Sequence, residues 1–226
     1  MKIHNFIVFD FETGGLDKKS QWHSNKVAIT QAAAIGVMSN DFKEIGRFSN
    51  FVLPNYDEEL EYQQTAFNIT GTSMEMLEKE GVSIDNLISK FIDLFEKTNT
   101  GTRFTKPILV GQNVTYDIPF LQRLFSYKKL DLSKWLSGYK DHFGNFHPNY
   151  IDTCWLSRIK KAEEGMKHGL GDICQREKVD LVDAHEAFND VIATLEVFKK
   201  YILALRSGQG KSEGMGESIF REQFEI

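Results

Sequence analysis

The stretch F-I-V-F-D-F-E-T-G-G, residues 6 to 15, is an apolar run that ends in two carboxylates, Asp10 and Glu12. In a β-strand residues i and i+2 point to the same face, so Asp10 and Glu12 project together while the flanking phenylalanines point the other way. Two anions this close repel each other, and in a partly buried place they require a shared cation or a raised pKa on one carboxyl group. A divalent metal is the simpler explanation. The alternative is a strand that frays into solvent, with residues 13 to 15 as its turn.

The composition is that of an ordinary globular protein with one core. The chain has 226 residues, of which 41% are hydrophobic and 26% charged, and this length suits a single domain. Its formal net charge of -5 argues against a protein that coats nucleic acid through many Lys and Arg side chains, but it permits an enzyme that grips a few nucleotides through bound cations. No apolar run approaches the ~20 residues of a membrane span, and the N-terminus lacks a signal-peptide cleavage site. We expect a soluble, cytoplasmic protein with no membrane partner.

The two cysteines, Cys154 and Cys174, lie in segments with helical patterns. They form no C-x-x-C pair, and no histidine lies at metal-ligand spacing from them. We therefore expect reduced core residues, with neither a zinc site nor a disulfide.

Hydrophobic patterning places strands first and helices afterwards. Apolar segments with turn signals between them predict a strand meander over residues 3 to 11, 27 to 38 and 46 to 53. Apolar residues at helical spacing follow in the segment 83 to 97, and a short strand at 107 to 112 precedes a further helix. Additional helices are predicted at about 152 to 161, 169 to 177 and 186 to 206. This order indicates a sheet with helices on its faces, of the α/β or α+β class.

The last twenty residues have a different composition. Four glycines make the segment from Ser207 to Glu217 a flexible linker, and the residues after it could form a short amphipathic turn through Phe220 and Phe224. We therefore expect a domain over residues 1 to 206, followed by a linker and tail at 207 to 226 that attaches to a larger partner, such as a replication or repair protein. Docking of the tail on its own domain is the competing interpretation.

A third carboxylate, Asp117, follows the predicted strand at 107 to 112 and lies in the first turn of the next helix. Its side chain would then lie beside the C-terminal end of that strand, which is where ligands bind in open α/β sheets. The structural alternative is an acidic residue favoured at a helix N-terminus by the helix dipole.

The final helix opens with the sequence D-A-H-E-A-F-N-D-V, in which five positions separate His185 from Asp190. Five residues turn a helix by about 500°, so the two would not share a face if both were helical. We therefore expect His185 in the loop or first turn, above a cavity that Asp190 approaches from the helix. Alternatively, Asp183 and Glu186 form a capping pair and leave His185 as an exposed residue of the first turn.

Three motifs stand in a fixed order: D-F-E-T-G-G-L at 10 to 16, G-Q-N-V-T-Y-D-I-P-F-L at 111 to 121, and A-H-E-A-F-N-D-V at 184 to 191. In order and spacing they resemble the motifs of the DEDDh 3′-5′ exonucleases, the DnaQ-like branch of the ribonuclease H-like superfamily. The resemblance covers about residues 1 to 204. It implies an α/β, ribonuclease H-like fold with a central mixed five-stranded sheet flanked by helices. The sequence departs from the family at Gln112, where the family often has His.

By this resemblance four carboxylates hold two Mg²⁺ or Mn²⁺ ions: Asp10, Glu12, Asp117 and Asp190. Hard oxygen ligands suit these ions rather than zinc. His185 marks the His branch of the family and is expected to accept a proton from the attacking water. The product would be a nucleoside 5′-monophosphate.

Further residues are assigned to substrate binding. The resemblance places the 3′ end of the substrate on the turn with Thr13 and Gly14, near Asn113, and puts Leu16 against the terminal base. A plain packing role for Leu16 is the alternative. Lysines surround Trp22 in the stretch 17 to 26, which is longer than the usual turn of the family, and this mixture suits phosphate contact and base stacking. A variable surface loop is the other interpretation of this stretch.

The expected function is metal-dependent hydrolysis from single-stranded or frayed nucleic-acid 3′ ends. We favour DNA as the substrate, in proofreading, repair or nucleotide recycling. The alternative is RNA, as for ribonuclease T or oligoribonuclease, because a metal site of this kind does not sense the 2′-hydroxyl. A third hypothesis is a non-catalytic domain that docks nucleic acid. Loss of a motif carboxylate would favour that hypothesis, and all four carboxylates are present.

Overall fold

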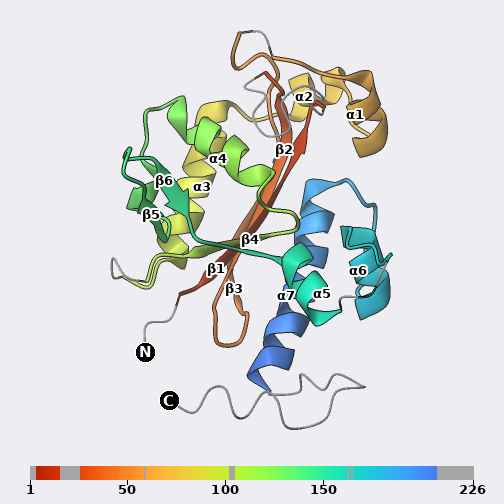
Figure 1. The fold of residues 1–226 in the computed structure, drawn as a ribbon. Coiled ribbons are helices and arrows are strands. Elements are labelled where there is room, and N and C mark those ends of the chain that lie inside the picture. The colour runs from red at the N-terminus through yellow and green to blue at the C-terminus, as the bar shows by residue number, and fades with distance from the viewer. Residues whose placement is uncertain are drawn as a thin grey trace.

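A mixed five-stranded sheet forms the centre of the computed structural model, which describes residues 4–15, 26–58, 60–101, 105–161, 163 and 165–207. The strands lie in the order β3-β2-β1-β4-β7 (Figure 1). β1, β2 and β3 pair antiparallel, whereas β4 and β7 run parallel to β1. The strands are β1 (Phe6–Thr13), β2 (Ile29–Val37), β3 (Glu44–Phe51), β4 (Ile108–Gly111) and β7 (Tyr150–Asp152). The predicted meander and the predicted fold class are confirmed.

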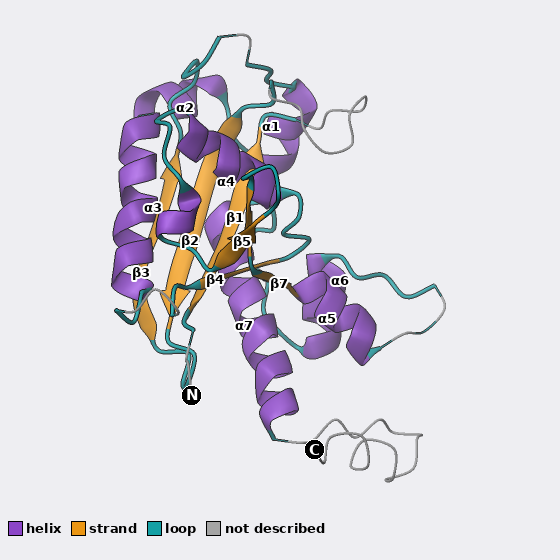
Figure 2. Ribbon diagram, turned by 60° about the vertical axis from the view of Figure 1, so that its left-hand side comes forward, coloured by secondary structure: helices purple, strands orange, loops and turns teal. Residues whose placement is uncertain are grey.

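Helices cover both faces of this sheet. α3 and α4 lie on one face, and α7, with α5 and α6 beside it, lies on the other (Figure 2). The helices are α1 (Gln64–Thr70), α2 (Met74–Glu80), α3 (Ile84–Thr98), α4 (Asp117–Ser126), η1 (Leu132–Lys134), α5 (Thr153–Lys160), α6 (Leu170–Glu177) and α7 (Ala187–Arg206). A small separate hairpin joins β5 (Gly138–Lys140) to β6 (Phe146–Pro148).

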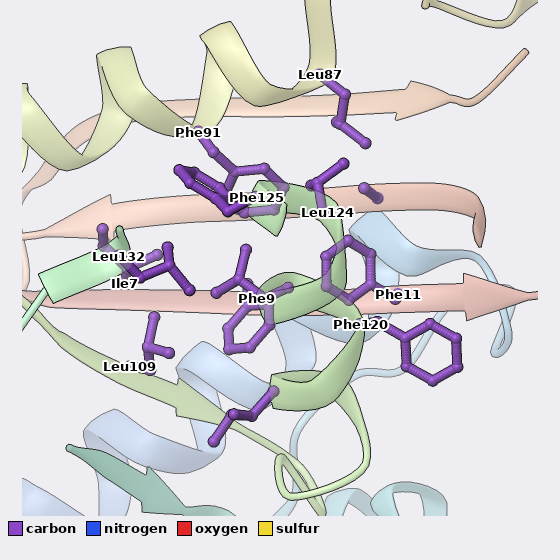
Figure 3. Close-up of a cluster of buried hydrophobic side chains, with 14 of the residues drawn as sticks. Ile7, Phe9, Phe11, Leu87, Phe91, Leu109, Phe120, Leu124, Phe125 and Leu132 are labelled. Carbon is purple, nitrogen blue, oxygen red and sulfur yellow. The ribbon is translucent and has the colours of Figure 1, made fainter. Parts of the chain in front are cut away.

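The larger hydrophobic core lies between the sheet and helices α3 and α4 (Figure 3). β1 contributes Phe9 and Phe11 to it, as the two-residue period of a strand requires. The ring of Phe11 lies 5.8 Å from that of Phe91 on α3, and the ring of Phe91 lies 6.4 Å from that of Phe125 on α4. These contacts hold α4 against β1 and so fix where the N-terminus of α4 lies.

The opposite face of β1 packs against α7. Phe6 and Val8 join Val191 and Phe198 in a second core, and the rings of Phe6 and Phe198 meet edge to face at 5.0 Å. The next residues on this face of β1 are the two carboxylates of the opening motif. The apolar part of α7 therefore covers the beginning of β1, and the first turns of α7 lie beside the acidic end of the strand.

Other predictions meet the structure with mixed results. The helices predicted after residue 83 are confirmed, and Cys154 and Cys174 are buried free thiols in α5 and α6. The hairpin, β7, α1 and α2 were not predicted from the residue pattern. No helix within the described ranges combines the length and apolarity that crossing a bilayer requires. The predictions for Leu16, Trp22 and the tail after Ser207 concern positions outside the described residues.

Candidate active site

Two segments far apart in the sequence bring acidic side chains and a histidine together at the C-terminal end of β1. Glu12 comes from the strand, Asp190 from the first turn of α7, and His185 from the loop before that helix. One potential ligand atom from each of these three side chains lies within 4.8 Å of the other two. The structure therefore brings together residues that the sequence assigned to one site.

Asp117 joins this cluster through the backbone of β1. The pairing of β1 with β4 ends at Val8 and Val110, so β1 runs on beyond its neighbour. There the backbone N–H of Phe11 donates to Asp117 Oδ1 at 3.2 Å. Asp117 is the first residue of α4 and only 3% exposed. The predicted position in the first turn of a helix is confirmed, but the strand that the Asp117 carboxylate contacts is β1 and not the preceding strand β4, beside whose end it was predicted.

The four carboxylates destabilise one another's charged forms. Burial raises the pKa of Asp10 to about 7, with a further contribution from the charge of Asp190. Burial, followed by the charges of Asp10 and Asp190, raises the pKa of Glu12 to about 9. Burial and the charge of Asp10 also hold the pKa of Asp117 well above its ordinary value. Asp117 is buried and the other three acids are half-buried, and all four have raised pKa values, so a bound cation would relieve the unfavourable charge of the site.

The donor set fits a hard divalent metal. Asp190 Oδ1 is buried and has no hydrogen-bond partner within the described part of the chain. A buried oxygen of this kind costs free energy unless another group binds it. Several carboxylate oxygens in one site are the ligands that Mg²⁺ and Mn²⁺ prefer, whereas structural zinc favours sulfur and nitrogen.

His185 lies in the loop two positions before α7, as its spacing from Asp190 predicted. Its backbone has a φ of 73°, in the left-handed region, and its side chain is exposed. Glu186 is the N-cap of the helix and accepts a hydrogen bond from the backbone N–H of Asn189 at 2.9 Å. The alternative with Asp183 and Glu186 as a capping pair is therefore wrong in part: Glu186 itself is the N-cap, and Asp183 is not.

The turn after Glu12 is held by the segment that leads into α1. The N–H of Gly14 donates to the Ala28 carbonyl at 2.8 Å, and the Gly14 carbonyl accepts from the N–H of Gln63 at 2.6 Å. A Cβ atom at Gly14 would lie 2.6 Å from the carbonyl oxygen of Glu61. The absence of a side chain at this position is thus required by a close approach of backbone.

A pair of hydroxyls links this turn to α4. Thr13 Oγ1 lies 3.1 Å from the hydroxyl of Tyr116, and Thr13 also donates to the carbonyl of Gly15 at 3.1 Å. Tyr116 directly precedes Asp117 in the chain. The hydroxyl pair therefore ties the segment that carries Glu12 to the segment that carries Asp117.

Asn113 and Gln112 lie at the end of β4. Asn113 is exposed with a φ of 54°, and its N–H donates to Asp152 Oδ1 at 2.9 Å. Gln112 accepts from Thr153 Oγ1 at 2.5 Å and donates to the carbonyl of His168 at 2.8 Å. Gln112 therefore bridges α5 and the segment before α6.

One residue near the cluster, Gln31, was not identified from the sequence as part of the site. Gln31 is a polar residue in the otherwise apolar strand β2, and it is 3% exposed. It donates to Glu186 Oε1 at 2.6 Å. A single amide side chain within a buried strand is the signal that could have identified it.

A mixed five-stranded sheet with acidic residues at the end of its central strand has the architecture of the ribonuclease H-like nucleases. The chain belongs to the RNase T exonuclease family, whose model matches residues 7–198. Among curated proteins it resembles DNA polymerase III PolC-type of Staphylococcus aureus, with 29% identity, and that of Staphylococcus epidermidis, with 28% identity, each over 91% of this chain. The chain spans only 12% of the length of these relatives.

Solved structures of Escherichia coli exonuclease I share the fold. The complex of that enzyme with a dT13 oligonucleotide aligns with a TM-score of 0.66 and 20% identity, over 91% of this chain and 42% of the other. A complex of exonuclease I with SSB-Ct aligns with a TM-score of 0.63 and 19% identity, over 92% of this chain and 42% of the other.

Proposed function

We propose that this protein is a 3′-5′ exonuclease that uses two divalent metal ions and releases nucleoside 5′-monophosphates from free 3′ ends of DNA. The observation that carries the proposal is the meeting of Glu12, Asp190 and His185 within 4.8 Å, beside Asp10 and Asp117. Membership in an exonuclease family supports hydrolysis from an end.

The four carboxylates would hold the metal ions: the charge of Asp190 acts on Asp10 and Glu12, and the charges of Asp10 and Glu12 act on Asp117. When bound, Mg²⁺ or Mn²⁺ ions supply a water of lowered pKa and stabilise negative charge on the departing 3′ oxygen. His185 accepts a proton at a ring nitrogen during hydrolysis, and its exposed position beside Glu12 suits a group that exchanges protons with solvent.

DNA is the proposed substrate because both groups of relatives point to it. The curated relatives are DNA polymerases, and the exonuclease I structures contain oligodeoxynucleotides. The substrate contacts proposed from the sequence are Thr13, Gly14, Leu16, Trp22 and Asn113. Of these, Asn113 is exposed at the end of β4, where a nucleotide strand beside the acidic cluster could reach it.

We also propose that residues 1–206 form the catalytic unit and that residues 207–226 attach it to a larger partner. α7 ends at Arg206, which supports a boundary at this point. One of the aligned structures is the complex of exonuclease I with SSB-Ct, and this precedent in a protein of the same fold supports a protein partner for the chain.

Matched DNA and RNA oligonucleotides with a 5′ label and a free 3′ hydroxyl test this function. We expect Mg²⁺ or Mn²⁺ to support stepwise shortening from the 3′ end, faster on DNA, with mononucleotides as the product. Asp190→Asn is the control for contaminating nucleases. Cleavage at internal positions, or equal hydrolysis by wild type and Asp190→Asn, would refute the proposal. Faster shortening of RNA would support the proposed reaction but show that RNA, and not DNA, is the preferred substrate.

A further inference from the structure

We propose that Gln31 and Glu186 form a clamp that positions His185 for proton transfer. The inference rests on the proposed function, since it assigns Gln31 as a positioning residue that acts through the histidine. Gln31 lies on β2 directly opposite Glu12 in the strand register. The same rung of the sheet thus carries an acidic residue of the site and the residue that fixes the loop before α7.

The clamp consists of three hydrogen bonds. Gln31 Nε2 donates to Glu186 Oε1 at 2.6 Å, and Gln31 Oε1 accepts from the N–H of Ala187 at 3.2 Å. The second carboxylate oxygen of Glu186 accepts from the N–H of Asn189 at 2.9 Å. Two of the backbone donors that every helix leaves unpaired in its first turn are therefore satisfied by one connected pair of side chains.

This pair holds a part of the chain that is not in a relaxed conformation. His185 and Asp183 have φ values of 73° and 45°, in the left-handed region that is unfavourable for residues other than glycine. Such a conformation persists only where its surroundings determine it. The clamp binds the chain at Glu186 and Ala187, immediately after His185, and so fixes the point from which the imidazole projects toward Glu12.

The hydrogen bonds of Gln31 require a donor and an acceptor on the same side chain. An amide at position 31 can donate to Glu186 and accept from Ala187 at the same time, whereas a carboxylate there would face the carboxylate of Glu186. Exchanging the two residue types, so that the carboxylate lies at position 31 and the amide at position 186, restores all three hydrogen bonds. In Gln31→Glu/Glu186→Gln, residue 31 would accept from Ala187 and from the amide of residue 186, whose oxygen would still accept from Asn189.

The test measures kcat and KM for Gln31→Glu, Glu186→Gln and the reversed double variant. We expect each single variant to lower kcat by about 10- to 100-fold, because misplacing a catalytic group by about 1 Å costs rate on this scale. KM should change little. The double variant should recover most of the lost kcat. A double variant with kcat as low as that of the single variants would overturn the clamp.

A second double-mutant cycle tests whether the loss of kcat in Gln31→Glu depends on His185. In a His185→Asn background there is no imidazole left to position, so adding Gln31→Glu should lower kcat little further. A Gln31→Glu effect of undiminished size in this background overturns the positioning role.

Asn5 provides a matched control at the other end of the same strand pair. It is 5% exposed, donates to the Thr98 carbonyl at 2.9 Å and accepts from the N–H of Ser39 at 3.1 Å. Asn5→Leu should lower the melting temperature as Gln31→Leu does, but should leave kcat of the remaining folded protein near that of wild type. Equal loss of kcat in both variants would mean that general destabilisation explains the effect.

Amide hydrogen exchange separates this proposal from the proposed function. Gln31→Leu should speed exchange at Ala187, whose N–H loses its acceptor, and to a smaller extent at Asn189, whose acceptor Glu186 loses the bond from Gln31 that holds it, whether or not the protein hydrolyses DNA. Unchanged exchange at these amides overturns the clamp. Absence of hydrolysis by the wild-type protein overturns the proposed function instead.

Discussion

Asp10 is a carboxylate of the cluster whose pKa burial and the charge of Asp190 raise to about 7. Because burial and the charge of Asp190 oppose its ionisation, Asp10→Asn should remove repulsion from the metal-free fold while abolishing hydrolysis. We expect a melting temperature in EDTA equal to or above that of wild type, with each kcal/mol gained raising it by about 2–4 °C. Calorimetry and oligonucleotide hydrolysis measure the two effects.

Asp131 is the matched control for this variant. It is exposed, and hydrogen bonds led by that from Lys140 lower its pKa to about 2, so its charge is favourable where the charge of Asp10 is not. Asp131→Asn should give no stabilisation and normal turnover. Near-normal hydrolysis by Asp10→Asn would rule out its assignment as a metal ligand.

His185 can be replaced without disturbing its unusual backbone. Asn adopts the left-handed region more readily than most residues, so His185→Asn removes the imidazole while tolerating a φ of 73°. We expect the chemical step to slow by about 10²- to 10⁴-fold with Mn²⁺ and substrate affinity retained. Single-turnover kinetics and Mn²⁺ titration measure this, with the exposed His147→Asn as the control. Much weaker Mn²⁺ binding would make His185 a metal ligand instead of a proton acceptor.

The sequence predicts part of this site because some of its geometry is local. The shared face of Asp10 and Glu12 follows from the period of a strand, and the loop position of His185 follows from its spacing to Asp190. The contact between Gln31 and Glu186 joins positions 155 apart, and that between Thr13 and Tyr116 joins positions 103 apart. Such pairs depend on how the elements pack, which no local pattern records.

At the scale of elements, Gly14 sets how closely the lead-in to α1 approaches the end of β1. Gly14→Ala places a Cβ 2.6 Å from the carbonyl oxygen of Glu61, and relieving this clash between backbone segments should destabilise the fold by about 1–3 kcal/mol. Denaturant unfolding measures the change. Gly46→Ala is the control, because its Cβ would meet Leu94 at an ordinary 3.5 Å. Equal stability of both variants would contradict the close approach.

Most of the longer elements show a recognisable period, and the four-residue β4 was predicted from a short apolar run, whereas the seven-residue helices α1 and α2 were not predicted. β1, β2 and α3 have 8, 9 and 15 residues, and their patterns were recognised. β7 and the strands of the hairpin have only three residues each, too few to establish alternation. The order of the strands in the sheet depends on long-range pairing and was not predicted, since the family resemblance implied only a central mixed five-stranded sheet.

At the scale of the whole molecule, the acidic cluster makes the stability of the metal-free protein depend on pH. The folded pKa values of about 7 for Asp10 and about 9 for Glu12 exceed the ordinary values of 3.8 and 4.5. The folded state therefore binds these protons more tightly than the unfolded state. Their contribution to stability is fully present below about pH 4 and is lost as the pH rises through 7 and 9.

We therefore expect the melting temperature in EDTA to fall between pH 5 and pH 9 more steeply for wild type than for Glu12→Gln. Saturating Mn²⁺ should reduce the difference, because the cation binds the deprotonated carboxylates. Melting curves across this range, with and without Mn²⁺, measure both effects. A wild-type curve parallel to that of Glu12→Gln in EDTA would contradict the raised pKa of Glu12.

The C-terminal boundary gives a further prediction for the whole chain. Ser207 closes α7 through its N–H to the Leu203 carbonyl at 2.9 Å, and the Arg206 guanidinium donates to the Ser39 carbonyl at 2.6 Å. A chain that ends at Ser207 retains both bonds, so we expect an unchanged melting temperature and unchanged hydrolysis of short oligonucleotides. Ending the chain at Leu195 instead removes Phe198 from the core and should prevent folding. Loss of activity on ending at Ser207 would show that the tail belongs to the catalytic unit.

The acidic residues of the site are spread along nearly the whole chain, from Asp10 near its beginning to Asp190 on the last helix. During synthesis, a ribosome-bound chain that has not yet reached residue 190 lacks both Asp190 and the helix that covers β1. Such a chain cannot assemble the site, whatever metal is present. The proposed exonuclease activity would thus be withheld from incomplete chains by the order of the sequence.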